Sequence, residues 1–256
     1  MATFIINTKA ELWKCRKTAA YWITLIAGIF IPLVMWLMMT IDAKEFVRDF
    51  GNDAWQTLMR ACWQPTAAFL MPMYVILVTS LVVQIEYRNN TWKQVYASPR
   101  SYADIFFSKF LVIHGLILTA LLLFNLSILV AGYGANAIHG TYKFFDTAVP
   151  WTDMLTVTGK MYTAVLAMTA IQYWISLRFK NFIAPIGIGL ALLITGIMIV
   201  QWKHVVYYPY AYTLLTYFKN LNKGNAVLVH LNYSWIWFVG ITLLAFWDTV
   251  KRKERG

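Results

Sequence analysis

Long runs of apolar residues, separated by shorter polar and charged stretches, dominate the chain. Each run is close to the roughly 20 residues that an α-helix needs to cross the hydrocarbon core of a membrane. We therefore predict six membrane-spanning helices, at Tyr21–Ile41, Thr66–Ile85, Phe110–Ala131, Leu155–Leu177, Phe182–Trp202 and Asn232–Trp247. We expect Pro65 to open the second of them, and residues 1–256 to form a single all-α membrane domain without a separate soluble part.

The composition agrees with this interpretation and excludes other classes. Of the 256 residues, 60% are hydrophobic and 13% are charged, and the mean hydropathy is +0.56. A soluble domain is usually about half apolar and about a quarter charged, so a water-soluble enzyme is excluded. The aromatic content of 17% excludes a disordered chain.

The distribution of Lys and Arg predicts the orientation in the membrane. Placing both termini in the cytosol puts 14 of the 22 basic residues in inner segments and 8 in outer segments. Membrane proteins concentrate positive charge on the cytosolic side. The net charge of +11 therefore reflects topology, and we expect no nucleic-acid partner. On this topology Cys15 and Cys62 lie on opposite sides of the membrane, so we predict two free thiols.

Motifs that would give the chain chemistry of its own are missing from the sequence. There is no phosphate-binding Gly-x-x-x-x-Gly-Lys-Ser/Thr loop, no His-Glu-x-x-His pair and no paired-cysteine site. The four histidines are scattered along the chain. We predict no catalytic residue, no metal site and no bound cofactor.

Residues 1–20 form a leader that mixes apolar and basic side chains. Leu12 and Trp13 fall near one helical face, and Arg16 falls elsewhere. Such a pattern is typical of an amphipathic helix that lies flat in the inner headgroup region, with Trp13 as its anchor. The alternative is an irregular basic leader that only obeys the positive-inside rule.

The inner loop at 86–109, between the second and third spans, is the most informative segment. Thr91–Ala97 can form a short helix that places Lys93 on one side. Its apolar side is made by Trp92, Val95 and Tyr96. Ser98-Pro99 has the form of a helix start, with Ser as the N-cap. An apolar surface in a cytosolic loop needs a place to be buried, which is either the lipid headgroups or a partner protein.

This segment carries a resemblance to a known family. Glu86 at the end of a span, the run Arg88-Asn89-Asn90-Thr91-Trp92-Lys93, and Lys109 before the next span resemble the first cytosolic loop of ABC-2 type exporter permeases. Two further features, the basic leader Ala10–Thr18 and Trp63-x-Pro65, are similar to permeases of bacterial antimicrobial-peptide (lantibiotic-type) immunity exporters.

The resemblance implies an architecture and partners. The subunit would have the ABC-2 type exporter fold, with six transmembrane helices, and would lie in the bacterial cytoplasmic (inner) membrane. It would pair with a second permease subunit, identical or different, and with two ATP-binding cassette subunits that bind ATP-Mg. The residues that couple it to the ATPase would be Glu86, Arg88, Thr91, Trp92, Lys93, Val95 and Tyr96.

Two further expectations concern this contact. The N-terminal helix, through Leu12, Trp13 and Arg16, would make a second contact with the ATPase. Glu86 is expected to hold the geometry of the loop through Arg88 or a backbone N–H. A loop that only binds lipid headgroups is the alternative.

Polar and soft side chains inside the spans are candidates for a substrate path. His114 and Asn125 are 11 residues apart, which leaves them about 20° apart around a helix. They either face a pathway or pack against another helix with Asn125 hydrogen-bonded across it, and we favour packing. Met35, Met38 and Met39 could give an adaptable lining, or could equally face lipid or the core.

Proline, glycine and tyrosine mark two other regions. Pro32 and Pro185 are expected to perturb their helices. The outer segment 203–231 is rich in tyrosine, and we expect it to form short helices that dip into the outer leaflet before the last span.

The sequence thus predicts the permease subunit of an ATP-driven exporter that moves an amphipathic peptide antimicrobial or a lipid-like substrate. One alternative is a non-transporting sensor or assembly subunit. Another is an ion-coupled secondary transporter, which is disfavoured because no acidic residue lies deep in a predicted span.

Overall fold

A computed structural model describes residues 2–43, 53–88, 101–218 and 228–253, and regular structure within these ranges is helical throughout. Five of the described helices are long and apolar enough to cross a membrane. They are α2 (Ala19–Ile41), α4 (Ala54–Pro65) continuing into α5 (Met71–Arg88), α7 (Tyr102–Ile138), α8 (Trp151–Arg178) and α11 (Val229–Lys253). The predicted all-α membrane fold is confirmed.

The fifth predicted span is shorter than expected. It corresponds to α9 (Ile183–Met198), an apolar helix of 16 residues. At 1.5 Å per residue it is about 24 Å long, less than the roughly 30 Å of a hydrocarbon core. By contrast, α7 has 37 residues and a length of about 55 Å, so it extends beyond the membrane.

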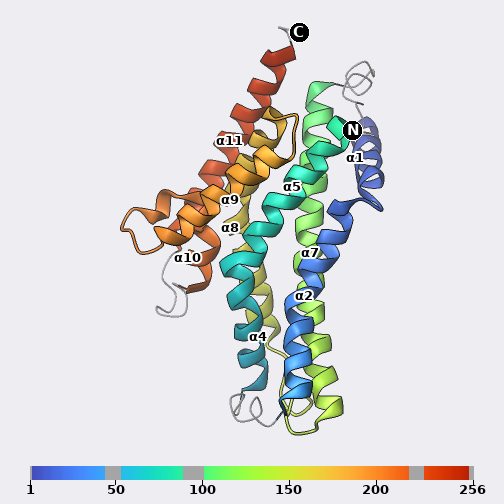
Figure 1. Ribbon diagram of the computed structural model, residues 1–256, viewed down its shortest axis with the longest axis vertical. Helices are drawn as coiled ribbons and strands as arrows, with labels where there is room; N and C mark the ends of the chain where they lie inside the picture. Colours follow the sequence, from blue (N-terminus) through green and yellow to red (C-terminus); the bar gives the residue numbers. More distant parts are fainter. Residues whose placement is uncertain (1, 44–52, 89–100, 219–227, 254–256) are drawn as a thin grey trace.

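The long helices run along the long axis of the molecule in Figure 1. The short helix α1 (Ala2–Cys15) lies at one end, together with the C-terminal ends of α5 and α11 and the start of α7. We call this the α1 end. At the opposite end lie the start of α4 and the C-terminal ends of α2 and α7. α2 packs along α7, α11 packs along α8, and α5 contacts α2, α8 and α9.

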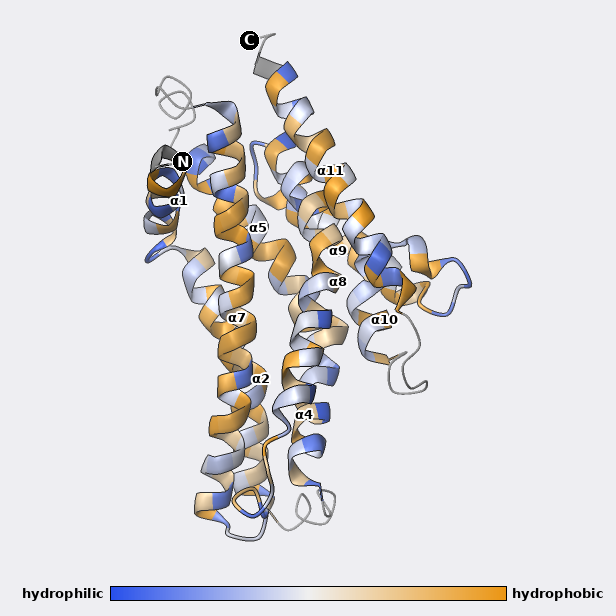
Figure 2. Cartoon of the chain, turned by 180° about the vertical axis from the view of Figure 1, so that it is seen from behind, coloured by the Kyte–Doolittle hydropathy of each residue, from blue (hydrophilic) through white to orange (hydrophobic). Residues whose placement is uncertain are grey.

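Burial separates a central helix from peripheral ones. In the most apolar stretch of the continuous helix α4–α5, 67% of the residues are buried, against 22% for α2 and for α11. Exposed leucines and isoleucines therefore cover the peripheral helices, as lipid-facing surfaces require. In Figure 2 the hydrophobic colour runs along most of α2 and α7, and hydrophilic residues gather in the connections at the two ends.

Pro65 does not open a span, so that prediction is wrong. The helix begins at Ala54, where the Asp53 carboxylate accepts a hydrogen bond from the Gln56 N–H at 3.3 Å. It continues through Pro65 into a π-helical turn, η1 (Thr66–Leu70), and then into α5. Proline lacks the N–H that an α-helix needs, and the wider turn that follows absorbs the irregularity.

The start of α7 is set by a capping residue. Ser101 is its N-cap, and the Ser101 hydroxyl accepts a hydrogen bond from the Asp104 N–H at 3.0 Å. An acidic residue in the first turn also favours a helix start. The helix start predicted at Ser98-Pro99 lies outside the described residues.

The tyrosine-rich segment before α11 is helical, as expected, but it is packed inside the protein. It comprises η2 (Val205–Tyr207), η3 (Pro209–Ala211) and α10 (Tyr212–Phe218). The expected position in the outer leaflet does not hold for Tyr210, Tyr212 and Tyr217, which are 2%, 0% and 8% exposed. A buried tyrosine usually finds a hydrogen-bond partner for its hydroxyl, and Tyr210 and Tyr217 both do.

Two of these tyrosines show how the segment is held. The Tyr210 hydroxyl donates to Gln172 Oε1 at 3.0 Å, and the Tyr217 hydroxyl donates to the Arg60 carbonyl at 3.0 Å. The segment thereby joins α8 to α4. Tyr207 and Trp202, which are about half exposed, lie on its outer side.

Close packing explains one of the glycines of α9. A Cβ added at Gly189 would lie 2.6 Å from Gln172 Oε1 and 2.8 Å from Ile76 Cγ2, so α9 approaches α8 and α5 closely at this point. Pro185 was expected to perturb α9, yet it is the third residue of the helix, where the N–H has no intrahelical partner. Pro32 does lie inside its helix, α2.

Candidate functional site

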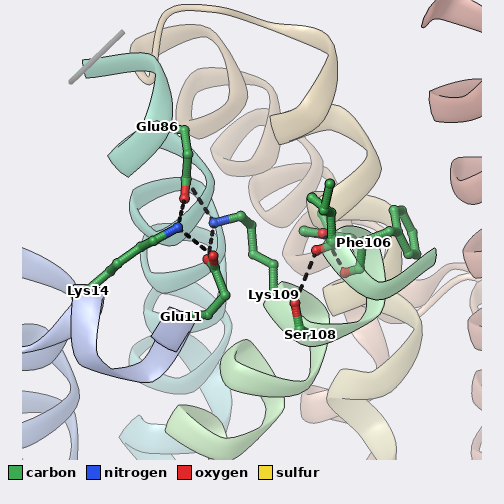
Figure 3. Close-up of polar contacts among 8 residues, drawn as sticks. Glu11, Lys14, Glu86, Phe106, Ser108 and Lys109 are labelled. Carbon is green, nitrogen blue, oxygen red and sulfur yellow. Dashed lines mark hydrogen bonds and ion pairs between the residues drawn. The ribbon is translucent and has the colours of Figure 1, made fainter. Parts of the chain in front are cut away.

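Four charged side chains from three helices form a closed ring at the α1 end (Figure 3). The Lys109 ammonium contacts Glu11 Oε2 at 2.6 Å and Glu86 Oε2 at 2.8 Å. The Lys14 ammonium contacts the other oxygens of the same carboxylates, Glu11 Oε1 at 2.5 Å and Glu86 Oε1 at 3.1 Å. Cations and anions alternate around the ring, so each charge has two neighbours of opposite sign. We call these four residues the ion cluster.

The sequence places these groups together through helix periodicity. In α1, Asn7, Glu11 and Cys15 are spaced by four residues and are all buried, on a helix that packs on α7. Glu86 lies in the last turn of α5, and Lys109 lies about two turns into α7. The cluster therefore joins α1, α5 and α7 at one point.

Burial makes the balance of charges important. The side chains of Glu86 and Lys109 are 1% and 2% exposed, and that of Glu11 is 6% exposed. A buried ion pair adds little to stability compared with well-packed apolar residues, but removal of one partner leaves an uncompensated charge and costs several kcal/mol. The ring is formally neutral, with two carboxylates and two ammonium groups.

The pKa of Glu11 follows from the same neighbours. Burial would raise it, but the charge of Lys109, together with hydrogen bonds from Lys109 and Lys14, outweighs burial and lowers the pKa below the ordinary 4.5. Glu11 is therefore ionised at neutral pH. The cluster acts as a fixed electrostatic clamp between three helices.

The structure places the predicted coupling residues as follows. Glu86 belongs to the ion cluster, and its described partners are Lys14 and Lys109; the expected contact with Arg88 is not among its described contacts. Arg88 is exposed at the end of α5. The remaining predicted residues lie outside the described residues, namely Thr91, Trp92, Lys93, Val95 and Tyr96.

The N-terminal helix presents its apolar side outward. Leu12 and Trp13 are 46% and 60% exposed, and Ile5 and Ile6 on the same helix are exposed too. The Arg16 guanidinium lies 5.2 Å from the centre of the Trp13 ring, within the range of a cation–π interaction. The outer side of α1 is thus apolar with a basic margin, a surface suited to lipid headgroups or to another protein.

The three methionines of α2 do not share one environment. Met38 is 42% exposed, Met35 is partly buried, and Met39 is completely buried in the core. Met39 therefore presents no surface to a path, because it packs inside the subunit. Met35 and Met38 retain exposed surface on the outside of the subunit.

His114 and Asn125 both pack against α8. The Asn125 amide donates to the Thr158 hydroxyl at 2.8 Å, and the Tyr162 hydroxyl lies 3.2 Å from His114 Nδ1. His114 also sits edge-on to Phe110 and Phe238. A groove of about 390 Å³ opens beside it, lined mainly by aromatic residues.

Sequence reasoning missed the amide at the centre of the bundle. Gln172 is completely buried, and its Nε2 donates to the Ser80 hydroxyl at 3.1 Å and to the Pro185 carbonyl at 2.9 Å. Its Oε1 accepts the hydrogen bond from Tyr210. Gln172 thus links α8 to α5, α9 and η3. An amide in the middle of a predicted span indicates hydrogen bonds to other helices, since a buried amide must find partners. The sequence does not show which residues these partners are.

Sequence reasoning also missed both acidic and basic partners on α1. The sequence shows Glu11 and Lys14 only as part of a basic leader. A buried lysine near a span end, such as Lys109, needs carboxylates. Lys109 therefore signals that carboxylate partners lie nearby. Only the fold shows that α1 supplies one of these carboxylates, Glu11.

Comparison with known proteins agrees with the helical architecture. A family model described as ABC-2 family transporter protein matches residues 8–196, about three quarters of the chain, and this range contains the whole ion cluster. No curated protein and no solved structure matches the chain. The matched range runs from α1 to near the end of α9. The chain therefore belongs to the ABC-2 family of transporter proteins, as a multi-pass permease component.

Proposed function

We propose that the chain is the permease subunit of an ATP-driven exporter in the bacterial cytoplasmic membrane, and that the ATPase acts on it through the segment between Glu86 and Ser101. The observation that carries this proposal is the ion cluster. Glu86 and Lys109 stand on the two sides of that segment and bind each other. A force applied to the segment therefore reaches α5 and α7 together.

The same clamp extends the connection to the N-terminal helix. Glu11 and Lys14 attach α1 to Glu86 and Lys109. α1 carries the outward apolar residues Leu12 and Trp13, which suit a second contact with the ATPase. The three helices respond as one unit, because moving one of them alone would separate buried charges.

α5 is well placed to pass the movement on. It is the most buried of the long helices and contacts α2, α8 and α9. The Gln172 amide ties α8 to α5 and α9 farther along the bundle. A displacement at the α1 end is thus transmitted by packed helices and hydrogen bonds to the centre of the subunit.

An amphipathic cargo, either a peptide antimicrobial or a lipid-like molecule, is the class we propose. The aromatic groove beside His114 supports it, since its lining is mainly apolar and one polar atom of a lining residue, His114 Nε2, is buried without a hydrogen-bond partner among the described residues. A cargo with an apolar body and one hydrogen-bonding group would satisfy that atom. We propose that two permease subunits and two ATPase subunits form the working complex.

Co-purification tests this function. The permease is expressed together with a candidate ATP-binding cassette protein from the same genome, and the complex is isolated through a tag on the permease. Replacing Trp92 and Tyr96 together with Ala should sharply reduce the ATPase recovered, because aromatic anchors commonly contribute 2 kcal/mol or more at an interface. Trp151→Ala is the matched control, since Trp151 is 57% exposed at the start of α8, far from the α1 end.

Three outcomes of this co-purification experiment can be told apart. Loss of the ATPase in the double variant, with the control unchanged and the permease still in the membrane, supports coupling through the segment. Full recovery of the ATPase with the double variant contradicts it. Recovery of no ATPase with the wild-type permease contradicts the proposed function as a whole.

A further inference from the structure

A cavity of about 880 Å³ opens at the α1 end, separate from the ion cluster. It lies where the start of α2, the end of α5 and the turn between α8 and α9 meet. Its basic lining residues are Lys17, Arg88 and Lys180, and its apolar lining includes Leu81, Ile85 and Phe182. The lining thus offers cations for an anion and apolar side chains for hydrocarbon.

The three basic groups differ from the lysines of the ion cluster. Lys14 and Lys109 each contact two carboxylates, whereas no carboxylate of the described residues forms an ion pair with Lys17, Arg88 or Lys180. They come from three different segments, so their convergence is produced by the fold rather than by a run of basic sequence. Like charges that converge on a cavity attract an anion from its surroundings.

The backbone at Lys17 gives an independent observation. Lys17 has a φ of 61°, in the left-handed region, and it follows the last turn of α1. Glycine is the usual residue at this position after a helix, because a side chain is strained there. A lysine held in a strained conformation at the rim of a cavity points to a use for its side chain.

We propose that this cavity binds the headgroup phosphate of an anionic phospholipid, with the start of its acyl chains against Leu81, Ile85 and Phe182. Lysine and arginine form charge-assisted hydrogen bonds with phosphate oxygens. Basic pockets between membrane helices on the cytosolic side are suited to anionic lipid headgroups. The first turn of α2 lines the same cavity, and its N–H groups add a favourable field for an anion.

A lipid fits these features better than a free anion does. The cavity is large enough for a headgroup and glycerol backbone, and its apolar lining would contribute nothing to inorganic phosphate. It lies at the start of α2 and the end of α5, two apolar helices long enough to span a membrane, where we expect the headgroups. Arg88 is the last described residue before the segment 89–100, so the bound lipid would touch the base of the proposed ATPase contact.

The test uses the full chain, purified and placed in nanodiscs of phosphatidylcholine with or without phosphatidylglycerol. Lipid that stays bound is measured by native mass spectrometry after release into detergent. The wild-type protein should retain phosphatidylglycerol in preference to phosphatidylcholine. The triple variant Lys17→Gln, Arg88→Gln, Lys180→Gln should lose this preference, by about fivefold for each charge removed. A control triple variant of exposed lysines, Lys9→Gln, Lys143→Gln and Lys203→Gln, should keep it.

A second comparison separates binding from folding. Lys17→Gly removes the strain and the charge together, so it should leave the melting temperature unchanged or higher while it weakens phosphatidylglycerol binding. Lys143→Gly is the matched control, because Lys143 also has a positive φ, of 59°, but lies in the turn between α7 and α8 at the opposite end. It should give the same change in melting temperature with unchanged lipid binding.

Four results would overturn the proposal. The first is a triple variant that keeps the wild-type lipid preference. The second is a Lys17→Gly variant that binds less lipid only because it unfolds. The third is inorganic phosphate that raises the melting temperature as much as phosphatidylglycerol does, which would assign the cations to a free anion. The fourth is a Lys180→Cys variant that forms a disulfide between two copies in high yield, which would assign the cavity to a dimer interface.

Discussion

Lys109 donates a hydrogen bond from its ammonium group to Glu86 at 2.8 Å, with both side chains almost completely buried. The two residues are 23 positions apart and stand on either side of the segment that we propose contacts the ATPase. Two helices that this segment joins along the chain are thus also fastened to each other by buried charges. Through this contact, a movement of the segment would reach α5 and α7 together.

Replacing Lys109 with Met should destabilise the protein strongly. The substitution leaves two buried carboxylates facing one lysine, and an uncompensated buried charge costs about 3–5 kcal/mol. The pair Glu86→Gln with Lys109→Met should cost less than Lys109→Met alone, because Glu11 and Lys14 then remain as a balanced pair. Intrinsic tryptophan fluorescence during heating in detergent measures both effects.

The control is a more exposed ion pair near the same end. Arg178 and Asp248 lie 2.6 Å apart, with side chains 42% and 18% exposed. Arg178→Gln should cost about 1 kcal/mol or less. Equal losses in melting temperature for Lys109→Met and Arg178→Gln would show that the ion cluster is not the clamp described above.

The stability of the α1 end should depend on pH through Glu11. The folded-state pKa of Glu11 lies below its ordinary value of 4.5. Its contribution is therefore fully present above the unfolded pKa and is lost as the pH falls through the folded pKa. Glu11→Gln should show a smaller fall in melting temperature than the wild-type protein as the pH is lowered from 7 to well below 4.5. Parallel curves for the two proteins would contradict this assignment.

Gln172→Leu should lower stability by about 1–3 kcal/mol, because it leaves the buried hydroxyl of Tyr210 without its acceptor. Tyr210→Phe removes one hydroxyl and leaves the two donor contacts of Gln172 intact, so its cost should be smaller. Gln56→Leu, at an exposed site on α4, is the matched control and should change stability by about 0.5 kcal/mol or less. A Gln172→Leu variant as stable as the control would show that the amide does not hold the four elements together.

Topology can be read by cysteine labelling in intact cells. Lys143→Cys, in the turn between α7 and α8, should react with a membrane-impermeant maleimide from outside, and Lys9→Cys on α1 only after permeabilisation. The native thiols should give little background, since Cys15 and Cys62 are buried and burial raises the pKa of Cys15 to about 11. Labelling of Lys9→Cys in intact cells would reverse the proposed orientation.

The sequence predicted the helices well where hydrophobicity alone decides them. The first, third, fourth and sixth predicted spans all fall within described helices, because a run of apolar residues must be helical to satisfy its backbone in lipid. It failed at Pro65, where a π-helical turn allows the helix to continue. Local propensity favours a break at proline, and only packing shows that the helix is continued.

The candidate site was harder to predict because its partners are distant in the sequence. The periodicity of α1 shows that Glu11 is one helical turn from Asn7 and Cys15, but not that this side faces α7. Composition favours an interfacial position for the tyrosines before α11. Tyr210 and Tyr217 are core residues instead, since Gln172 and the Arg60 carbonyl accept their hydroxyl groups.

We propose that the ion cluster links the ATPase to the membrane helices. The ATP hydrolysis rate of the reconstituted complex tests this link when it is compared with that of the isolated ATPase subunit, at a temperature where every variant is folded. With Lys109→Met in the permease, the complex should still assemble, but its hydrolysis rate should fall to that of the isolated subunit. A Lys109→Met complex that hydrolyses ATP at the wild-type rate would contradict the account.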